Sequence, residues 1–109
     1  MREIDEILAL DGLRIVMVAM TDLSKALGYP FEYEHPEVWK ALDGIVEKAG
    51  KRNIAVAANM GYDYTTHERM VARVQRMRSH GVRLCLMQGA DNMLENFARP
   101  MLQEIRGPG

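Results

Sequence analysis

Three short runs of apolar residues, separated by stretches with helical spacing, constrain the fold of this chain more than any other feature. The runs are Leu13–Met20, Ile54–Ala58 and Val82–Met87. Near-continuous apolar runs of this length are typical of strands buried on both faces. No hairpin signal separates them, and strands that alternate with helices pair in parallel through right-handed crossovers. The sequence therefore predicts an α/β fold with about three parallel strands.

Helical stretches lie before, between and after these runs. Apolar side chains recur at helical spacing in each stretch, and glycine or proline marks the boundaries. The expected helices are Arg2–Leu10, Thr21–Leu27, one from Pro36 to Gly50, one capped by Thr65 or Thr66 and ended by Gly81, and Asp91–Ile105, interrupted at Pro100.

Three strands of this kind cannot close into a barrel, because the parallel barrel of alternating strands and helices uses about eight. With 109 residues, the chain is the size of one small domain, which we take to span residues 1–109. It is therefore an open three-stranded sandwich, part of an oligomer, or a piece of a longer protein.

Composition argues against several classes of partner. The formal net charge is -1, from 14 basic and 15 acidic residues, which does not favour binding to nucleic acid or to an anionic membrane. The single Cys85 excludes an internal disulfide and a cysteine-rich zinc site. Neither a signal peptide nor a transmembrane run is evident, so we expect a cytoplasmic protein.

Functional side chains in parallel α/β folds gather where strands end. Asp22 follows the first apolar run directly, and a carboxylate there can bind a hard cation such as Mg²⁺. The simpler interpretation is that Asp22 or Thr21 caps the next helix, and position alone favours it. One carboxylate does not make a metal site.

The remaining polar candidates favour structural roles. Helix capping is the better interpretation of Asp91, and Asn59 at a strand end is more often a turn former than a ligand-binding residue. The histidines show no metal-ligand spacing and are expected at the surface or at helix ends. Cys85 is expected to be inert within the core. The histidines are His35, His67 and His80.

One block of residues resembles a known family. It comprises a strand after Asp11-Gly12, then Asp22-Leu23-Ser24, then Leu27-Gly28-Tyr29, and finally His35-Pro36-Glu37-Val38. This order and spacing resemble the HpcH/HpaI aldolase and citrate lyase β-subunit-like superfamily. The resemblance covers nearly all of this chain but only about the last two-fifths of a family member. It implies part of a (β/α)₈ TIM barrel.

The resemblance also implies a chemistry. In the family, the aspartate of the Asp-Leu-Ser motif, here Asp22, binds Mg²⁺ or Mn²⁺ together with a glutamate at the end of the preceding strand. The metal stabilises the enolate of pyruvate in a reversible aldol reaction on 2-keto-3-deoxy or 4-hydroxy-2-oxo acids. Backbone amides of the turn before the aspartate help to bind the pyruvate carboxylate, which places Thr21 and Asp22 beside the substrate.

Two departures from the family pattern bear on this expectation. The family has glycine and proline where this chain has Ala19 and Met20, and we expect the methionine to narrow the approach to a ligand. The partner glutamate, and the family's arginine and histidine base, would lie before Met1. Glu3 and Glu6 lie on the helix that follows and cannot replace that glutamate.

Three hypotheses follow. The chain belongs to a metal-dependent carbon–carbon lyase, inactive alone and completed by a missing N-terminal half or by a homo-oligomer with exchanged C-terminal helices. Alternatively, it is a non-catalytic α/β relic or assembly module with exposed strand edges. A receiver-like domain built around Asp22 is the weakest, because such a domain needs an acidic cluster at an earlier strand end.

Overall fold

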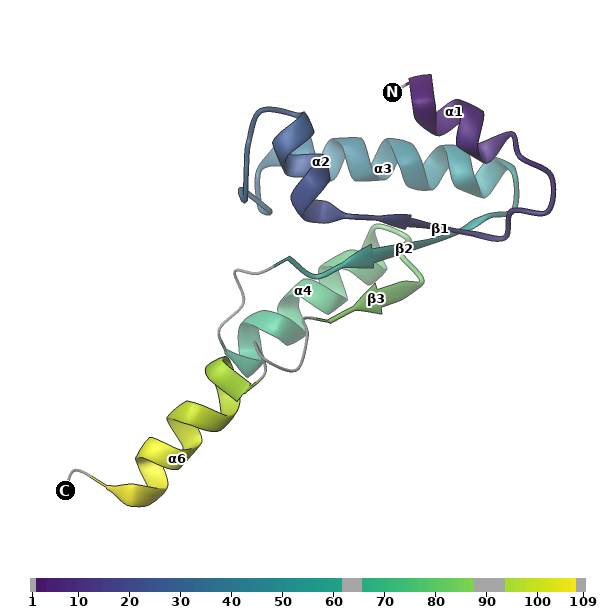
Figure 1. Ribbon diagram of the computed structural model, residues 1–109. Helices are drawn as coiled ribbons and strands as arrows, with labels where there is room; N and C mark the ends of the chain where they lie inside the picture. Colours follow the sequence, from purple (N-terminus) through teal and green to yellow (C-terminus); the bar gives the residue numbers. More distant parts are fainter. Residues whose placement is uncertain (1, 62–65, 88–93, 108–109) are drawn as a thin grey trace.

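The computed structural model describes residues 2–61, 66–87 and 94–107, and shows helices alternating with strands (Figure 1). The elements are α1 (Arg2–Leu8), β1 (Ile15–Val18), α2 (Met20–Ala26), α3 (Pro36–Lys51), β2 (Ala55–Asn59), α4 (His67–Ser79), β3 (Leu84–Leu86), the π-helical turn η1 (Leu94–Ala98) and α6 (Arg99–Arg106).

The strands form one parallel sheet in the order β1-β2-β3. Met17 is paired with Ala57, which is paired in turn with Leu84, so these three side chains share one face. The expected α/β architecture with three parallel strands is confirmed. β1 and β3 are shorter than their apolar runs, whereas β2 is as long as its run and lies one residue further along the chain.

The core lies on one face of the sheet only. Val18, Val56 and Ala58 pack there among side chains of the helices, including Leu42 of α3 and Met77 of α4. Figure 1 shows the strands in front of α3 and α4. Asp5 of α1 and Lys48 of α3 form an exposed ion pair at 3.0 Å, which joins two helices on this side.

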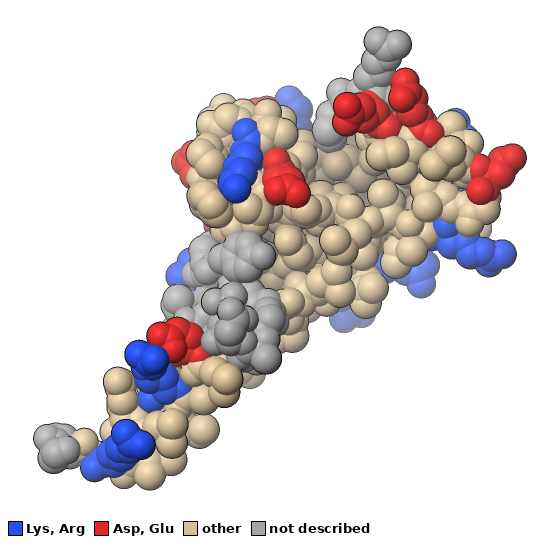
Figure 2. Space-filling view, in the orientation of Figure 1, with Lys and Arg blue, Asp and Glu red and all other residues tan. Residues whose placement is uncertain are grey.

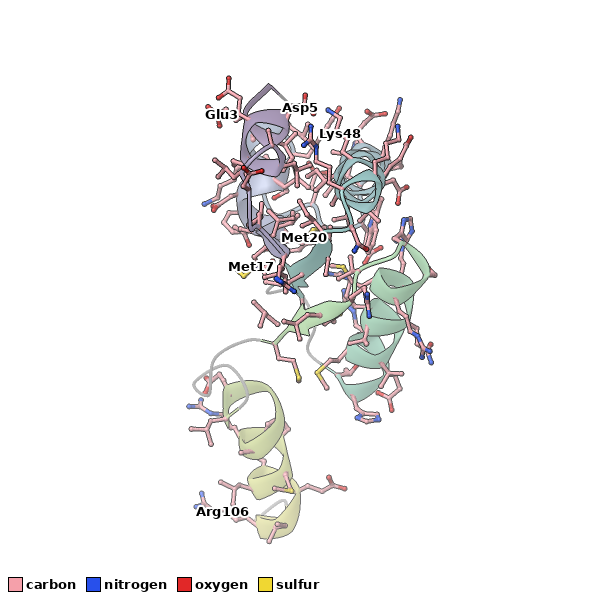
Figure 3. All side chains as sticks on the ribbon, turned by 90° about the vertical axis from the view of Figure 1, so that its right-hand side faces the viewer. Glu3, Asp5, Met17, Met20, Lys48 and Arg106 are labelled. Carbon is pink, nitrogen blue, oxygen red and sulfur yellow. The ribbon has the colours of Figure 1, made fainter. Side chains whose placement is uncertain are left out.

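The expectation of strands buried on both faces is wrong for β1 and β3. Ile15 and Met17 are 47% and 56% exposed, and Leu84 and Leu86 are 48% and 38% exposed. We call these four residues the open face. Figure 3 shows Met17 on the side of the sheet away from α3 and α4. The apolar runs do form strands, but on this face the side chains of β1 and β3 are exposed and only Ala57 between them is buried.

The helix boundaries follow their caps. His35 caps α3, with its Nδ1 accepting a hydrogen bond from the Glu37 N–H at 3.1 Å, and Pro36 occupies the first turn. Thr66 caps α4, with its Oγ1 accepting from the Arg69 N–H at 3.2 Å. The alternative cap, Thr65, lies outside the described residues. Helix α1 ends at Leu8, two residues before the expected boundary.

The C-terminal segment is interrupted where Pro100 predicted. Residues 94–98 form η1, and α6 then begins at Arg99 with Pro100 in its first turn. Helix α6 contacts η1 and extends away from the sheet (Figure 1). Met101, Leu102 and Ile105 are exposed on it. Across the described ranges, no helix has the length and hydropathy needed to cross a bilayer.

Candidate functional site

Asp22 lies in the first turn of α2, immediately beyond the carboxyl end of β1, and its side chain is exposed. Within the described ranges, its carboxylate makes no hydrogen bond or ion pair. The N-cap of α2 is Ala19, which makes no side-chain capping bond. The expectation that Asp22 or Thr21 caps this helix is therefore wrong, and the carboxylate is available for another partner.

Asn59 supplies the cap instead. It is the last residue of β2, and its Oδ1 accepts a hydrogen bond from the Met20 N–H at 2.8 Å. The first turn of a helix has N–H groups without intrahelical partners, and a side-chain oxygen satisfies one of them. The Oδ1 of Asn59 thus acts as a helix cap rather than in a turn. It joins the end of β2 to the start of α2.

Met20 affects the turn before Asp22 through its backbone. Its side chain is 0% exposed and belongs to the core, so it does not narrow a ligand's approach as expected. Its N–H is taken by Asn59, so that amide cannot also bind a substrate carboxylate. Only the backbone amides of Thr21 and Asp22 remain for that role.

The loop between α2 and α3 folds back over this turn. Tyr33 is 2% exposed, and its hydroxyl forms a 2.9 Å hydrogen bond with Thr21 Oγ1. Ser24 donates through Oγ to the Thr21 carbonyl at 2.8 Å and accepts from the Phe31 N–H at 3.1 Å. The loop therefore holds Thr21 directly through Tyr33 and indirectly through Phe31 and Ser24.

A glycine lets Tyr33 pack against the end of β2. Gly61 has φ +80°, and a Cβ on it would lie 2.9 Å from Cδ1 of the Tyr33 ring. Such a contact is too close for two carbon atoms, so only glycine accommodates both the backbone conformation and the ring. Gly61 thus sets where Tyr33, and through it Thr21, can lie.

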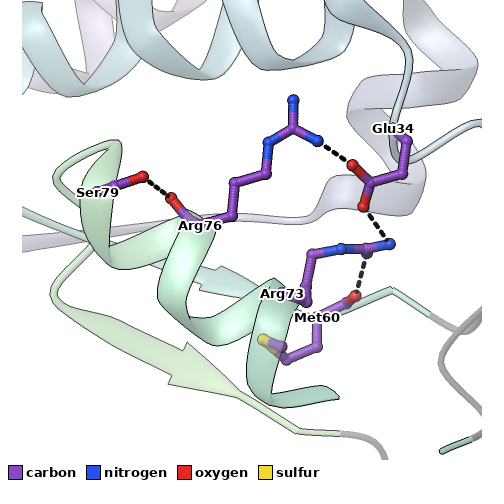
Figure 4. Close-up of polar contacts among 5 residues, drawn as sticks. All are labelled: Glu34, Met60, Arg73, Arg76 and Ser79. Atoms are coloured by element: carbon purple, nitrogen blue, oxygen red, sulfur yellow. Dashed lines mark hydrogen bonds and ion pairs between the residues drawn. The ribbon is translucent and has the colours of Figure 1, made fainter. Parts of the chain in front are cut away.

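Arg73 of α4 anchors the same loop from below (Figure 4). Its guanidinium is 5% exposed, donates through Nη1 to the Met60 carbonyl at 2.8 Å and lies 2.7 Å from Glu34 Oε1. Arg76 makes a second ion pair with Glu34. Arg73 also lies 5.7 Å from the centroid of the Tyr33 ring. A buried charge with this many partners fixes the loop relative to the end of β2.

A groove of about 750 Å³ runs beside Asp22. Its apolar wall comes from α1, β1 and α2, and it is lined by two exposed carboxylates, Glu3 and Asp22. No group of three or more potential metal ligands occurs among the described residues. These residues alone therefore do not fit a complete divalent-metal site, because Asp22 is one ligand where several oxygen ligands are needed.

The other sequence candidates have structural roles or lie outside the described part. His80 follows α4, where it contacts Asp43 and lies 4.7 Å from the Trp39 ring. His67 begins α4 and is exposed. Cys85 is half-buried against the core, and burial raises the pKa of its thiol. Asp91 falls outside the described residues.

The turn of Asp22 and the loop that covers it lie within a recognisable family segment. A sequence profile of the HpcH/HpaI aldolase/citrate lyase family matches residues 1–90. This chain belongs to the HpcH/HpaI aldolase/citrate lyase family. A search of curated proteins finds no significant match.

Three solved structures share the fold of this chain. The chain superimposes with a TM-score of 0.78 and 24% identity on a HpcH/HpaI aldolase/citrate lyase family protein from Burkholderia cenocepacia, covering 97% of this chain and 38% of that one. For the HpcH/HpaI aldolase from Desulfitobacterium hafniense, the TM-score is 0.73 and the identity 22%, covering 99% and 39%. For the citrate synthase SbnG, the TM-score is 0.67 and the identity 18%, covering 94% of this chain and 39% of that one.

The chain spans about two-fifths of the length of these relatives. Its three strands and their helices thus correspond to one part of a larger HpcH/HpaI-type barrel. This confirms the partial TIM barrel that the family resemblance implied.

Proposed function

We propose that this chain is the Asp22-bearing part of a carbon–carbon lyase that forms or cleaves 2-keto-3-deoxy or 4-hydroxy-2-oxo acids through a pyruvate enolate. The observation that carries the proposal is the family match across residues 1–90, which includes an exposed Asp22 at the carboxyl end of β1 that has no partner among the described residues. Strand ends of this kind are where parallel α/β enzymes place their functional groups.

In this proposal Asp22 is one ligand of a Mg²⁺ or Mn²⁺ ion, and the backbone of Thr21 and Asp22 faces the carboxylate of the keto acid. The remaining metal ligands come from outside the described residues, since these hold no ligand group of sufficient size. That the 109 residues are inactive alone is part of the same proposal. A cytoplasmic location agrees with this chemistry and belongs to the same proposal.

We also propose that the working protein is an oligomer in which α6 packs on a neighbouring copy. The support is the exposure of Met101, Leu102 and Ile105 on a helix that extends away from the sheet (Figure 1). Apolar surface of this kind commonly marks an interface. Sedimentation at micromolar concentration tests the idea with Ile105→Lys as the disrupting variant, and a monomeric wild-type chain would count against it.

A non-catalytic module is the second candidate. It is favoured by the absence of a complete metal-ligand group among the described residues. In this case the fold survives as an assembly element, and Asp22 has no chemical task.

Exchange of the pyruvate methyl protons in D₂O distinguishes the two candidates. It should be followed by NMR with Mg²⁺ or Mn²⁺, for the wild-type chain and for Asp22→Asn. Exchange that requires both the metal and Asp22 supports the lyase, and if the chain achieves it alone, the claim of inactivity in isolation is wrong. If exchange never appears, even when the missing part of the barrel is supplied, the non-catalytic module stands.

A further inference from the structure

The open face is apolar and bare, although the rest of the sheet is packed. Parallel sheets in proteins are normally covered on both faces, because they expose no polar alternation to water. Here the helices cover only one face, while Ile15, Met17, Leu84 and Leu86 are exposed on the other. Figure 2 shows the corresponding surface, with a broad central area free of charged side chains and the charges at its periphery.

The outer edge of β1 is also unoccupied among the described residues, since β1 pairs only with β2. The groove of about 750 Å³ runs along this edge, and Ile4 and Ile7 of α1, Val16 and Val18 of β1 and Leu23 of α2 line it. An unpaired strand edge beside an apolar groove is a template for another strand. The open face and the edge groove are continuous, because Met17 belongs to both.

A second copy of this chain does not cover both surfaces at once. Two copies related by a two-fold axis can join their β1 edges or stack their open faces, and each arrangement leaves the other surface exposed. A polypeptide that adds parallel strands beside β1 and curls over the sheet covers both, because a closed barrel has no edge and its inner face meets itself.

The related structures are longer than this chain, and their additional part indicates which polypeptide would cover both surfaces. This chain superimposes with a TM-score of 0.78 over 97% of its own residues but over only 38% of the Burkholderia cenocepacia protein. This chain therefore has the same fold as one part of that protein, and the remaining strands of that protein have no counterpart in this chain. We propose that the open face and the edge groove of β1 dock a polypeptide carrying those remaining strands of the barrel.

The two carboxylates of the groove add a chemical condition. Glu3 and Asp22 both line it and are exposed. An occupant that buries them must bring compensating positive charge, either a basic side chain or a shared metal ion, since an unpaired buried carboxylate is costly. The docking polypeptide is thus apolar along its inner face and cationic or metal-bridged where it meets Asp22.

The probe is the portion of the Burkholderia cenocepacia protein that has no counterpart in this chain, made as a separate polypeptide and co-expressed with the full 109 residues. The corresponding portion of the Desulfitobacterium hafniense aldolase serves as a second probe. We expect a one-to-one complex in sedimentation. The double variant Met17→Lys/Leu84→Lys should weaken it at least about 100-fold, because each lysine would be buried without a partner.

Val71→Lys is the matched control, because Val71 is an exposed apolar residue on α4, away from the open face. It should change the affinity by less than about threefold, since single surface substitutions have small effects. All three proteins should show the same helical circular dichroism, because every substituted side chain is exposed in the free chain.

A covalent chimera, with the probe portion placed before Met1, keeps the test decisive if a probe is insoluble by itself. The chimera should unfold in one thermal transition, and Met17→Lys/Leu84→Lys should split or abolish that transition. Failure of both probes to bind and of the chimera to fold would overturn the proposal. So would a wild-type homodimer that Met17→Lys/Leu84→Lys separates, because a second copy would then cover the face. A complex that forms but does not exchange pyruvate protons overturns only the proposed function.

Discussion

The side-chain oxygen of Asn59, at the end of β2, accepts a hydrogen bond at 2.8 Å from the backbone N–H of Met20, at the start of α2. This single contact joins the end of β2 to the start of α2 across 39 residues of sequence and fixes the turn that presents Asp22. It also removes one amide from the set that could bind a substrate anion.

Asn59→Ala should therefore destabilise the chain by about 1–2 kcal/mol, because the Met20 N–H loses its cap. Thermal unfolding measures the loss as a lower Tm. Gln75→Ala, which removes an exposed amide from α4, is the control and should leave the Tm nearly unchanged. An Asn59→Ala protein as stable as the wild type would show that water satisfies the Met20 N–H equally well.

Two glycines with similar backbone conformations should respond differently to alanine. Gly61 has φ +80° and the Tyr33 ring beside it, whereas Gly28 has φ +86° and nothing within 4 Å of a Cβ. Gly28→Ala should cost only the backbone strain, about 1 kcal/mol. Gly61→Ala should cost about 1–3 kcal/mol more, because the ring must move. Chemical denaturation compares the two, and equal losses would mean that Tyr33 shifts freely.

The two arginines that pair with Glu34 should contribute unequally. Arg73 is 5% exposed and also bonds the Met60 carbonyl, whereas the Arg76 side chain is 40% exposed. Arg73→Met should cost about 1–3 kcal/mol, because the Met60 carbonyl loses its buried partner, while the half-exposed Glu34 keeps its ion pair with Arg76. Arg76→Met should cost about 1 kcal/mol or less, as expected for a partly exposed pair. Urea titrations of both variants measure the two losses of unfolding free energy. A larger loss for Arg76→Met than for Arg73→Met would contradict this prediction.

The thiol of Cys85 should react slowly while the chain is folded. Burial raises its pKa, so the thiolate fraction near pH 8 is smaller than in the unfolded chain. The folded state holds this proton more tightly, so the associated stability is present below the pKa of the unfolded thiol and is lost as the pH rises towards the folded pKa. Reaction with a coloured aromatic disulfide should accelerate in urea at pH 8. Equal rates with and without urea would mean that Cys85 is fully accessible.

The sequence predicted those parts of the fold that depend on local signals. Pro36, Thr66 and Pro100 mark the beginnings of helices in the structure, and each strand lies within its apolar run except for Asn59 at the end of β2. The prediction that β1 is buried on both faces was wrong. An apolar run indicates which side chains favour burial, but it does not show whether the residues that would bury them are present. Ile15 and Met17 look like core side chains and lie on a bare face.

The sequence predicted where the candidate site lies, but not which residues hold it in place. Asp22 was placed correctly at a strand end, while its capping role failed because the cap comes from Asn59, a tertiary contact that no local pattern encodes. Tyr33 gave no signal in sequence. Arg73 did, because it lies three residues after Met70 and four before Met77, on the apolar stripe of α4. A charged residue on that stripe indicates a buried ion pair.

Binding of Mn²⁺, followed by electron paramagnetic resonance, tests the central claim most directly, namely that Asp22 is one ligand of a metal site completed by another polypeptide. The isolated chain should bind Mn²⁺ no more tightly than Asp22→Asn. The complex with the missing barrel portion should hold one tight Mn²⁺, which Asp22→Asn abolishes and Glu37→Gln, at another exposed helix start, retains. Tight binding by the isolated chain, or binding to the complex that survives Asp22→Asn, would contradict the account.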